Sequence, residues 1–380
     1  MNNLNCKVSI ITVSYNSVKT IEQTITSVLS QSYKNIEYII IDGASTDGTQ
    51  QVIEKYKDKI SYYVSEKDKG LYYAMNKGLD VATGDIIGII NSDDWYTVDA
   101  VANVVECFAQ NDAELIYGLT VVVEQDGTEK LNRTKMLETI WHQAPFFHPS
   151  VFVKKDVYNR IGEFCTDYKV AADYDLLLKF YSENIKFQYI DKVIAYFRLG
   201  GISTVLMKTG YRENYKISMS YVDKCPNREY VLEQIKEHYE WACFTTDIEG
   251  IKGLFSDLLC EYFQENITEI SIFGIGSWGE YCYKILTENK IKILHIIDND
   301  EKKQNKNFHG IKILKPQMLK EINTPVLIAV REKGEKIQRQ LEDLNIRKEH
   351  CVTITELEAI FLRKQTRTGN NILSEYCDGE

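Results

Sequence analysis

Residues 88–95 read Gly-Ile-Ile-Asn-Ser-Asp-Asp-Trp, an apolar strand that ends abruptly in two adjacent carboxylates, Asp93 and Asp94. Acidic groups at the carboxyl end of a buried parallel strand lie where open α/β sheets bind their ligands. Hard oxygen ligands at this place suit Mg²⁺ or Mn²⁺, either of which neutralises a diphosphate. Paired acids also occur as solvated loop residues and as helix caps, so the segment by itself leaves both interpretations open.

The sequence around this segment alternates between strands and helices. Strands are expected at Val8–Val13, Glu37–Ile41, Ile60–Val64 and Asp85–Ile90, and helices at Ile21–Leu29, Asp47–Tyr56 and Tyr72–Ala82. This alternation predicts a mostly parallel, layered α/β sheet whose strands end at one edge. A more irregular half follows, with a helix expected at Asn103–Ala109 and strands at Leu115–Tyr117 and Thr120–Glu124.

The rest of the chain contains two further parts. Residues 211–265 are almost free of strand signals and carry Tyr, Lys and Glu at helical spacing, which predicts a helical bridge. After residue 267, strands, a glycine turn and helices alternate again, which predicts a small Rossmann-like domain. We therefore expect a catalytic domain over residues 1–205, a helical linker over 206–266, a Rossmann-like domain over 267–355 and a C-terminal tail over 356–380. The aromatic residues of the linker suit either a homo-oligomer interface or packing within the chain.

Composition excludes several classes of protein. The 380 residues, 44% hydrophobic and 26% charged, are typical of a globular protein of more than one domain. A net charge of −10 argues against a nucleic acid partner, because binding of phosphates needs a surplus of Lys and Arg. The nine cysteines are scattered without a Cys-x-x-Cys pair, which indicates reduced thiols rather than disulfides or a zinc site.

The ends of the chain bear on its location. Residues 1–7 lack the charged and then apolar pattern of a signal peptide, and no stretch approaches the roughly 20 apolar residues that span a bilayer. We expect a cytoplasmic protein. Arg363, Lys364 and Arg367 would allow peripheral contact with the inner face of an anionic membrane, and a solvated terminal helix is the simpler interpretation.

Four ordered segments join the acidic strand end in a recognisable pattern. They are Val8-Ser-Ile-Ile-Thr-Val-Ser14-Tyr15-Asn16, Tyr38-Ile-Ile-Ile-Asp42-Gly43-Ala44-Ser45-Thr46-Asp47-Gly48-Thr49, residues 65–78 (Ser-Glu-Lys-Asp-Lys-Gly-Leu-Tyr-Tyr-Ala-Met-Asn-Lys-Gly) and Ala171-Ala172-Asp173-Tyr174-Asp175-Leu176. With the Asn-Ser-Asp-Asp strand end, they closely resemble family 2 inverting glycosyltransferases of the glycosyltransferase-A fold. The resemblance implies transfer of a hexosyl group from a nucleotide sugar, commonly a UDP-sugar, assisted by Mn²⁺ or Mg²⁺.

The resemblance also implies roles for individual residues on the donor side. Ser14, Tyr15 and Asp42 match positions around the nucleobase, where Asp42 would accept a hydrogen bond from a base N–H. Asp93 matches the carboxylate near the ribose, and Asp94 matches the metal ligand under the diphosphate. Lys69 and Lys77 could add positive charge at the phosphates or be solvated helix lysines. His148, which precedes a proline, is a donor contact or a structural residue.

The run at 171–176 holds the general base in the family. Inverting transfer needs one carboxylate to take the proton of the acceptor hydroxyl while the anomeric carbon is attacked opposite the leaving diphosphate. We expect Asp173 to be this base and Asp175 to be the substitute candidate. The alternative is that both acids only cap the helix that begins here.

Analogy with the family suggests the acceptor and also shows where this chain differs from the family pattern. The acceptor would be a growing surface glycan or a lipid-linked saccharide. The chain has Gly43 where many members have a second Asp, Asn91 where an Asp is common, and Tyr73 where similar members often carry Asp. The sequence leaves the donor sugar, the acceptor and the linkage open.

A second glycine motif lies near residue 275. Gly274, Gly276 and Gly279, with Asp298 further on, fit the dinucleotide fingerprint, in which backbone N–H groups at a helix start face a pyrophosphate. The domain is small and no candidate for hydride transfer follows, so we favour a module that binds a nucleotide for regulation or that only packs against a partner. Two other hypotheses are an NAD-linked oxidoreductase and a non-catalytic sensor of sugar nucleotides.

Overall fold

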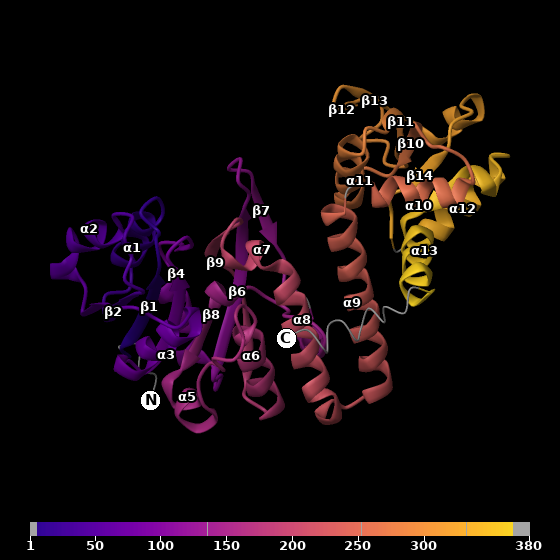
Figure 1. Cartoon of the computed structure of the whole chain (residues 1–380). Coiled ribbons are helices and arrows are strands. Elements are labelled where there is room, and N and C mark those ends of the chain that lie inside the picture. Colours follow the sequence, from indigo (N-terminus) through magenta and orange to yellow (C-terminus); the bar gives the residue numbers. More distant parts are fainter. Residues whose placement is uncertain (1–5, 135, 252, 332, 368–380) are drawn as a thin grey trace. The chain divides into compact units, whose positions relative to one another are not determined.

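The structure is a computed structural model that describes residues 6–367 except 135, 252 and 332. The chain divides into two compact units, residues 1–236 and 237–380 (Figure 1). The N-terminal residues 1–5, the predicted tail from 368 onward and Cys377 lie outside the described residues. The eight cysteines within the described part are all free thiols, as the sequence predicted.

The first unit is built on a sheet with the strand order β3-β2-β1-β4-β8-β6-β9-β5, and β7 pairs with β6. Its strands are β1 Val8–Ser14, β2 Ile36–Asp42, β3 Tyr62–Ser65, β4 Ile86–Asn91, β5 Trp95–Tyr96, β6 Leu115–Val123, β7 Glu129–Asn132, β8 Val151–Lys154 and β9 Phe187–Arg198. Its α-helices are α1 Ile21–Leu29, α2 Thr49–Glu54, α3 Leu71–Val81, α4 Ala100–Gln110, α5 Lys155–Ile161, α6 Ala172–Ser182, α7 Ile202–Val205 and α8 Met207–Tyr221. Short 3₁₀ helices cover Lys57–Lys59, Leu137–Trp141, His148–Ser150 and Val222–Lys224.

Strands β3, β2, β1 and β4 are parallel to one another, as the alternating pattern predicted. The remaining strands make the sheet mixed rather than mostly parallel, because β8 runs antiparallel to both β4 and β6, and β5 runs antiparallel to β9. The chain reaches these strands through irregular connections instead of regular βαβ crossovers. Only the first half therefore follows the simple α/β rule.

Alternate residues of β1 explain why the whole strand is buried. Ile10 belongs to a core cluster that includes residues of α1 and α4. Ile11 points to the other face, where a Cβ on Gly78 of α3 would lie only 2.4 Å from its side chain. Helices on both faces leave the strand no exposed positions, so β4 is almost entirely apolar and the polar Ser9 and Thr12 of β1 are buried with side-chain hydrogen bonds.

A buried carboxylate joins the start of β1 to β2. Glu37 accepts hydrogen bonds from Lys7 Nζ at 2.7 Å and Ser9 Oγ at 2.5 Å, and from the backbone N–H of Thr83 at 2.7 Å. Burial raises the pKa of Glu37, but these donors outweigh it and lower the pKa to about 2. The ionised carboxylate is therefore more stable in the folded protein than in the unfolded chain.

We expect Glu37→Gln to lower the free energy of unfolding at pH 7 by about 2 kcal/mol. Because the folded pKa lies below the ordinary value of 4.5, this contribution is present above that pH and is lost as the pH falls toward 2. Urea titrations of both proteins at pH 7 and pH 3 should therefore differ less at pH 3. Glu54→Gln is the control, because its ion pair with Lys57 is exposed and should matter by less than about 0.5 kcal/mol. A gap between wild type and Glu37→Gln that does not narrow at pH 3 would contradict the prediction.

The second half of the sheet differs from the sequence pattern at one strand. Residues 115–123 form one strand, β6, where two strands separated at residue 118 were expected. The pairing with β9 shifts register near Gly118, and a Cβ at this position would lie 2.5 Å from Ile194. The glycine marks a close approach within one irregular strand, which sequence punctuation alone does not distinguish from a turn.

The predicted helical stretch is helical, and it divides between the two units. It contains α8, α9 Arg228–Gly250 and α10 Leu254–Phe263, and the division falls within α9. Ser218 of α8 packs into the first unit, where its hydroxyl lies 2.9 Å from that of Tyr174. Trp241 and Phe244 belong to a core cluster of the second unit.

The second unit has a sheet with the order β12-β13-β11-β10-β14-β15, in which only β12 is antiparallel. Its strands are β10 Glu269–Phe273, β11 Lys292–Ile297, β12 Asn307–Phe308, β13 Ile311–Leu314, β14 Val326–Ile328 and β15 Cys351–Thr353. Its other helices are α11 Ser277–Glu288, α12 Gly334–Asp343 and α13 Ile354–Arg367. Short 3₁₀ helices cover Pro316–Glu321 and Lys348–His350. Leu357 and Phe361 of α13 are buried in its core. This helix is therefore packed on one face, whereas the sequence suggested a solvated helix.

Candidate active site

The parallel strands of the first unit end together at one edge of the sheet. Ser14 lies opposite Asp42, Asp42 lies opposite Ser65, and Val13 lies opposite Asn91. The register therefore brings four of the sequence motifs into one place. A hydrogen bond of 2.6 Å between the hydroxyls of Ser17 and Ser92 joins the turn after β1 to the turn after β4.

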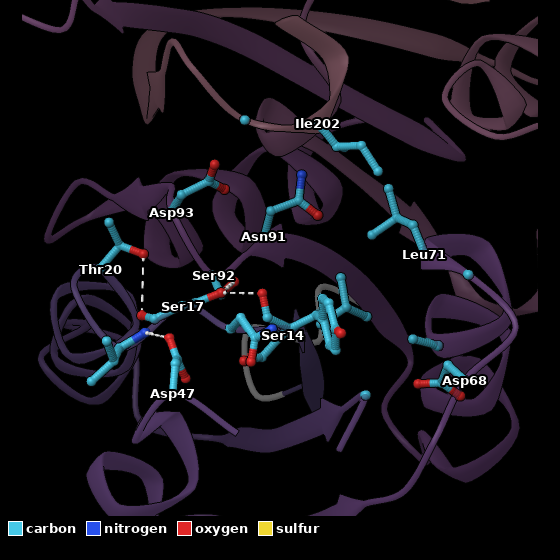
Figure 2. A pocket seen from close by; sticks show the side chains of 18 of the residues that line it. Ser14, Ser17, Thr20, Asp47, Asp68, Leu71, Asn91, Ser92, Asp93 and Ile202 are labelled. Carbon is cyan, nitrogen blue, oxygen red and sulfur yellow. Dashed lines mark hydrogen bonds between the residues drawn. The ribbon is translucent and has the colours of Figure 1, made fainter. Parts of the chain in front are cut away.

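A cavity of about 920 Å³ opens at this edge (Figure 2). Its charged lining consists of the cationic side chains Lys19, Lys67, Lys69 and Arg198 and the carboxylates Asp47, Asp68 and Asp93. Cations outnumber acids here although the whole chain has a net charge of −10. The cavity lining therefore carries a small surplus of positive charge in a chain that is acidic as a whole.

The turn after β1 forms the floor of the cavity. Ser14 and Tyr15, which the resemblance assigned to the donor side, both line it. Ser14 is buried and its hydroxyl has no hydrogen-bond partner, whereas Tyr15 is 68% exposed. The backbone N–H of Asn16 donates to Ser45 Oγ at 2.8 Å, which ties this turn to the one after β2. A flat aromatic ring and an unused hydroxyl on a fixed turn suit a planar, polar ligand.

Asp42 lies at the end of β2 but does not line the cavity. Its carboxylate is fully buried and accepts hydrogen bonds from the N–H of Ser45 at 2.9 Å, from Ser45 Oγ at 2.5 Å and from Ser65 Oγ at 2.6 Å. These donors use three of about four acceptor positions of a carboxylate. Asp42 therefore holds the turns after β2 and β3.

The two acids of the β4 strand end have different surroundings. Asp93 lines the cavity, whereas Asp94 is 1% exposed and lies beneath it. Burial raises the pKa of Asp93, and it raises the pKa of Asp94 well above the usual range, where the neighbouring Asp93 charge adds to the effect. Asp94 Oδ1 accepts the backbone N–H of Arg198 at 2.9 Å, but Asp94 Oδ2 is buried without a partner.

The oxygens at this strand end fit a divalent cation. Asn91 Oδ1 is also buried without a partner, and Figure 2 shows the Asn91 side chain next to that of Asp93. Unsatisfied buried oxygens of this kind mark a missing ion or donor. Within the described residues no cluster of three or more His, Cys, Asp or Glu side chains could hold a metal alone. The site therefore suits an ion that takes its remaining ligands from a bound phosphate, as Mg²⁺ commonly does.

Arg198 is a site residue that the sequence patterns did not reveal. It is the last residue of β9 and belongs to none of the sequence motifs, yet its side chain lines the cavity. Its guanidinium lies 4.9 Å from the centre of the Trp95 ring and donates to Gln23 Oε1 at 2.7 Å. Trp95 stacks on Tyr196 on β9 at 4.9 Å, so the indole supports the arginine within the fold.

Asp173 lies at the start of α6, next to one wall of the cavity. The hydroxyl of Tyr72 donates to Asp173 Oδ1 at 3.2 Å, and Leu71, the neighbour of Tyr72, lines the cavity. Burial lowers the pKa of His148, and the negative charge of Asp173 partly offsets this. The structure therefore brings Asp173 and His148 together, although neither lines the cavity itself.

Asp175 has other neighbours. It forms a hydrogen bond with Tyr221 of α8 and lies near Lys179; burial raises its pKa, and these two residues partly offset that rise. The two candidate acids thus point to different surroundings, because one residue separates them on a helix. Only Asp173 adjoins the tyrosine beside the cavity.

Glu213 of α8 holds the loop that leads to Asp173, and it too was missed in the sequence. Its carboxylate accepts hydrogen bonds from three successive backbone N–H groups, those of residues 169, 170 and 171, at 2.7, 2.9 and 3.1 Å. These N–H groups precede α6 and need an acceptor from outside the helix. No local pattern links Glu213 to residues more than 40 positions away.

The two lysines that were candidates for phosphate contacts differ in their position relative to the cavity. Lys69 lines the cavity and its ammonium lies 5.8 Å from the Tyr73 ring. Lys77 does not line it, and forms ion pairs with Asp68 and, at 2.7 Å, with Glu66. Lys69 is therefore placed to meet an anion directly, whereas Lys77 orders the acids around it.

In the second unit, the glycine turn is tied to its own acid. Asp298 accepts the backbone N–H of Ile275 at 3.0 Å and that of Asp300 at 2.8 Å. Gly274 has a φ of +94°, and a Cβ on Gly279 would lie 2.1 Å from Gly274 O, whereas Gly276 faces open space. The glycines allow a tight strand-to-helix turn, and nucleotide binding by this turn stays a prediction.

No helix in the described part of the chain is long and apolar enough to cross a membrane.

Two family models match the chain. The model described as glycosyl transferase family 2 matches residues 9–173, and the model described as C2185-like, N-terminal, matches residues 266–352. The first match covers all the motifs of the cavity and ends at Asp173. The second covers the sheet of the second unit up to β15.

Curated relatives carry glycosyltransferase names. An uncharacterised glycosyltransferase of Mycobacterium tuberculosis is 33% identical over 183 residues, which is 45% of this chain and 68% of the relative. The teichuronic acid biosynthesis glycosyltransferase TuaG of Bacillus subtilis is 34% identical over 131 residues, which is 34% of this chain and 52% of that protein. A PGL/p-HBAD biosynthesis glycosyltransferase of Mycobacterium bovis is 26% identical over 55% of this chain and 84% of the relative.

Solved structures share the fold. S. aureus TarS 1–349 in complex with UDP-GlcNAc matches with a TM-score of 0.52 and 19% identity over 65% of this chain and 76% of the TarS 1–349 chain. Mannosyltransferase PcManGT from Pyrobaculum calidifontis, in complex with GDP-Man and Mn²⁺, matches with a TM-score of 0.51 and 19% identity over 62% of this chain and 72% of that one. These matches confirm the expected glycosyltransferase-A fold.

Proposed function

The chain belongs to glycosyl transferase family 2, and from this premise we propose that it transfers a hexosyl group from a UDP-sugar to a hydroxyl of a growing surface polysaccharide or glycolipid. The observation that carries the proposal is the cavity at the strand ends, which four cationic side chains and the Asp93 carboxylate line together. A nucleoside diphosphate needs both a cationic lining and oxygen ligands for its counter-ion.

In this proposal Asp173 is the general base. Its carboxylate takes the proton of the acceptor hydroxyl as that oxygen bonds to the anomeric carbon. The bond between this carbon and the diphosphate oxygen breaks on the opposite side, so the configuration inverts. Tyr72 donates to one oxygen of Asp173 and leaves the other to the acceptor. Glu213 holds the preceding loop, so the carboxylate is kept in place.

Asp94 and Asn91, each with a buried oxygen that lacks a partner, would hold Mn²⁺ or Mg²⁺ together with the Asp93 carboxylate that lines the cavity. Bound there, the cation would neutralise the diphosphate as the sugar leaves it. Arg198 and Lys69 line the same cavity and add positive charge that belongs to the protein itself. Ser14 and Tyr15 would surround the nucleobase.

The proposed acceptor class rests on the names of relatives. Teichuronic acid is the product named for TuaG, and PGL/p-HBAD is named for the mycobacterial relatives. Both names describe biosynthesis that needs a sugar to be added to a larger acceptor. We propose the same broad class, a glycan or lipid-linked saccharide, for this chain.

A panel of nucleotide sugars tests the donor class. We expect purified protein with Mn²⁺ to hydrolyse one UDP-sugar slowly, at least about tenfold faster than with EDTA, because water can replace the acceptor. Released nucleoside diphosphate is the measurement, and GDP-, CDP- and ADP-sugars are the controls. Hydrolysis confined to a non-uridine donor would contradict the UDP assignment, and UDP binding with no turnover, even with acceptors added, would favour a sensor.

A further inference from the structure

One carboxylate that lines the cavity belongs to neither the proposed metal site nor the proposed base. The Asp68 side chain lines the cavity and is 8% exposed, and its Oδ2 is buried without a hydrogen-bond partner. Its other oxygen, Oδ1, is paired with the Lys77 ammonium, which Glu66 also holds. A buried carboxylate oxygen without a donor is unfavourable, so a ligand that brings an N–H group to it gains affinity.

The surroundings of this oxygen indicate which part of a nucleotide it would meet. A Cβ placed on Gly43 would lie 3.7 Å from Asp68 Oδ2, 3.3 Å from the Tyr15 ring and 3.6 Å from Ser14 O. The missing side chain at position 43 therefore leaves space between the aromatic ring and the carboxylate. Figure 2 shows Asp68 on the opposite side of the cavity from Asp93. The free oxygen thus lies at the end of the cavity away from the diphosphate ligands.

Asp42 is poorly placed for the same task. It does not line the cavity, and Ser45 and Ser65 already donate three hydrogen bonds to it. About one acceptor position of the Asp42 carboxylate is left, whereas Asp68 Oδ2 accepts no hydrogen bond and Asp68 lines the cavity.

We propose that Asp68, rather than Asp42, recognises the nucleobase of the donor. Its Oδ2 accepts a hydrogen bond from the N3–H of uracil. The inference rests on the proposed function for the presence of a uridine nucleotide. Tyr15, which is 68% exposed, stacks on the base while Asp68 receives its ring N–H. A base without this N–H leaves the carboxylate oxygen unpaired, which is how a site rejects an analogue lacking one donor.

The ion pair with Lys77 determines how the side chain of an Asp68→Asn variant would be oriented. The ammonium has no acceptor capacity, so the amide oxygen of asparagine must face Lys77 and the NH₂ group must face the cavity. The site then presents a donor, which opposes uracil N3–H and suits the N3 acceptor of cytosine. The preference for UDP over CDP should fall at least about tenfold relative to wild type.

Calorimetry with Mg²⁺ compares the binding of UDP, N3-methyl-UDP and CDP to the full chain. Wild type should bind UDP at least about tenfold more tightly than N3-methyl-UDP, and Asp68→Ala should bind the two within about twofold of each other. Glu66→Gln is the matched control, since Glu66 also pairs with Lys77 but does not line the cavity, and it should keep the wild-type ratios. Circular dichroism confirms that each variant folds, and Asp68→Asn preserves the shape of the side chain should the alanine variant unfold.

The outcomes separate this inference from the proposed function. If wild type discriminates and both Asp68 variants keep its ratios, another residue reads the base. If wild type binds UDP and N3-methyl-UDP equally, no acceptor in the site reads N3–H. If wild type binds no uridine nucleotide, the UDP-sugar proposal fails, and this inference fails with it.

Discussion

Asp173→Asn is expected to slow sugar transfer about 100-fold to 10,000-fold while UDP binding and the fold stay intact. Asparagine has nearly the shape of aspartate and still accepts the Tyr72 hydrogen bond, but it cannot take the proton of the acceptor hydroxyl. Turnover with donor and acceptor is the measurement, and UDP affinity by calorimetry separates loss of the base from loss of the site. Since the base acts on the acceptor, affinity for the donor should change less than about twofold.

Asp175→Asn is the matched control on the same helix turn. Asp175 lies with Tyr221 and Lys179, away from the tyrosine beside the cavity, so transfer should stay within about threefold of wild type. If Asp175→Asn proved the severe variant and Asp173→Asn the mild one, the base would be Asp175. If both variants reduced transfer equally and only slightly, neither carboxylate would be the base, and both would only stabilise the N-terminus of α6.

Asp94→Asn is expected to reduce transfer at least about 100-fold and leave the melting temperature unchanged or raised. Asp94 is 1% exposed and its Oδ2 has no partner, so its charge is unfavourable in the metal-free protein, and an amide of the same shape removes that charge. The same amide is a poor ligand for Mg²⁺ or Mn²⁺. A gain in stability with a loss of activity is the pattern expected of a site residue rather than of a structural one.

The metal dependence of UDP binding gives the second readout for this variant. Wild-type protein should bind UDP at least about tenfold more weakly after EDTA treatment, and Asp94→Asn and Asp93→Asn should show little further loss. Asp99→Asn is the control, because Asp99 is exposed at the start of α4 and should behave as wild type. Full activity of wild type in EDTA would remove the metal from the mechanism and leave the cationic side chains to neutralise the diphosphate.

The identity of the cavity could be read from local motifs, because the residues that build it lie at strand ends. Ser14, Tyr15 and Asp93 are found at the carboxyl ends of β1 and β4, as the strand pattern predicted, and they line one cavity. Parallel strands in register need no long-range information to bring their ends together. The layered α/β sheet followed from the same alternation of strands and helices, whereas the glycosyltransferase-A fold was implied by the resemblance to family 2 glycosyltransferases.

Contacts between distant segments were invisible in the sequence. Arg198 reaches Asp94 across more than 100 positions, and Glu213 holds the loop before Asp173 from α8. The single strand β6 and the mixed pairing of the second half also depend on partners far away in the chain. Such contacts arise from packing, and one sequence carries no signal for a pair that only the folded chain brings together.

The amino-acid sequence alone determined the parallel half of the sheet in the first unit, the edge at which its motifs meet and the residue types available there. The tertiary structure decided how similar acids differ: Asp93 lines the cavity and the buried Asp94 does not, Asp173 meets Tyr72 and Asp175 meets Tyr221, and Asp42 accepts three hydrogen bonds where Asp68 keeps a free oxygen. Strand and helix periodicity is a local property, which neighbouring residues specify. Burial and hydrogen-bond partners depend on what the rest of the chain places around each carboxylate.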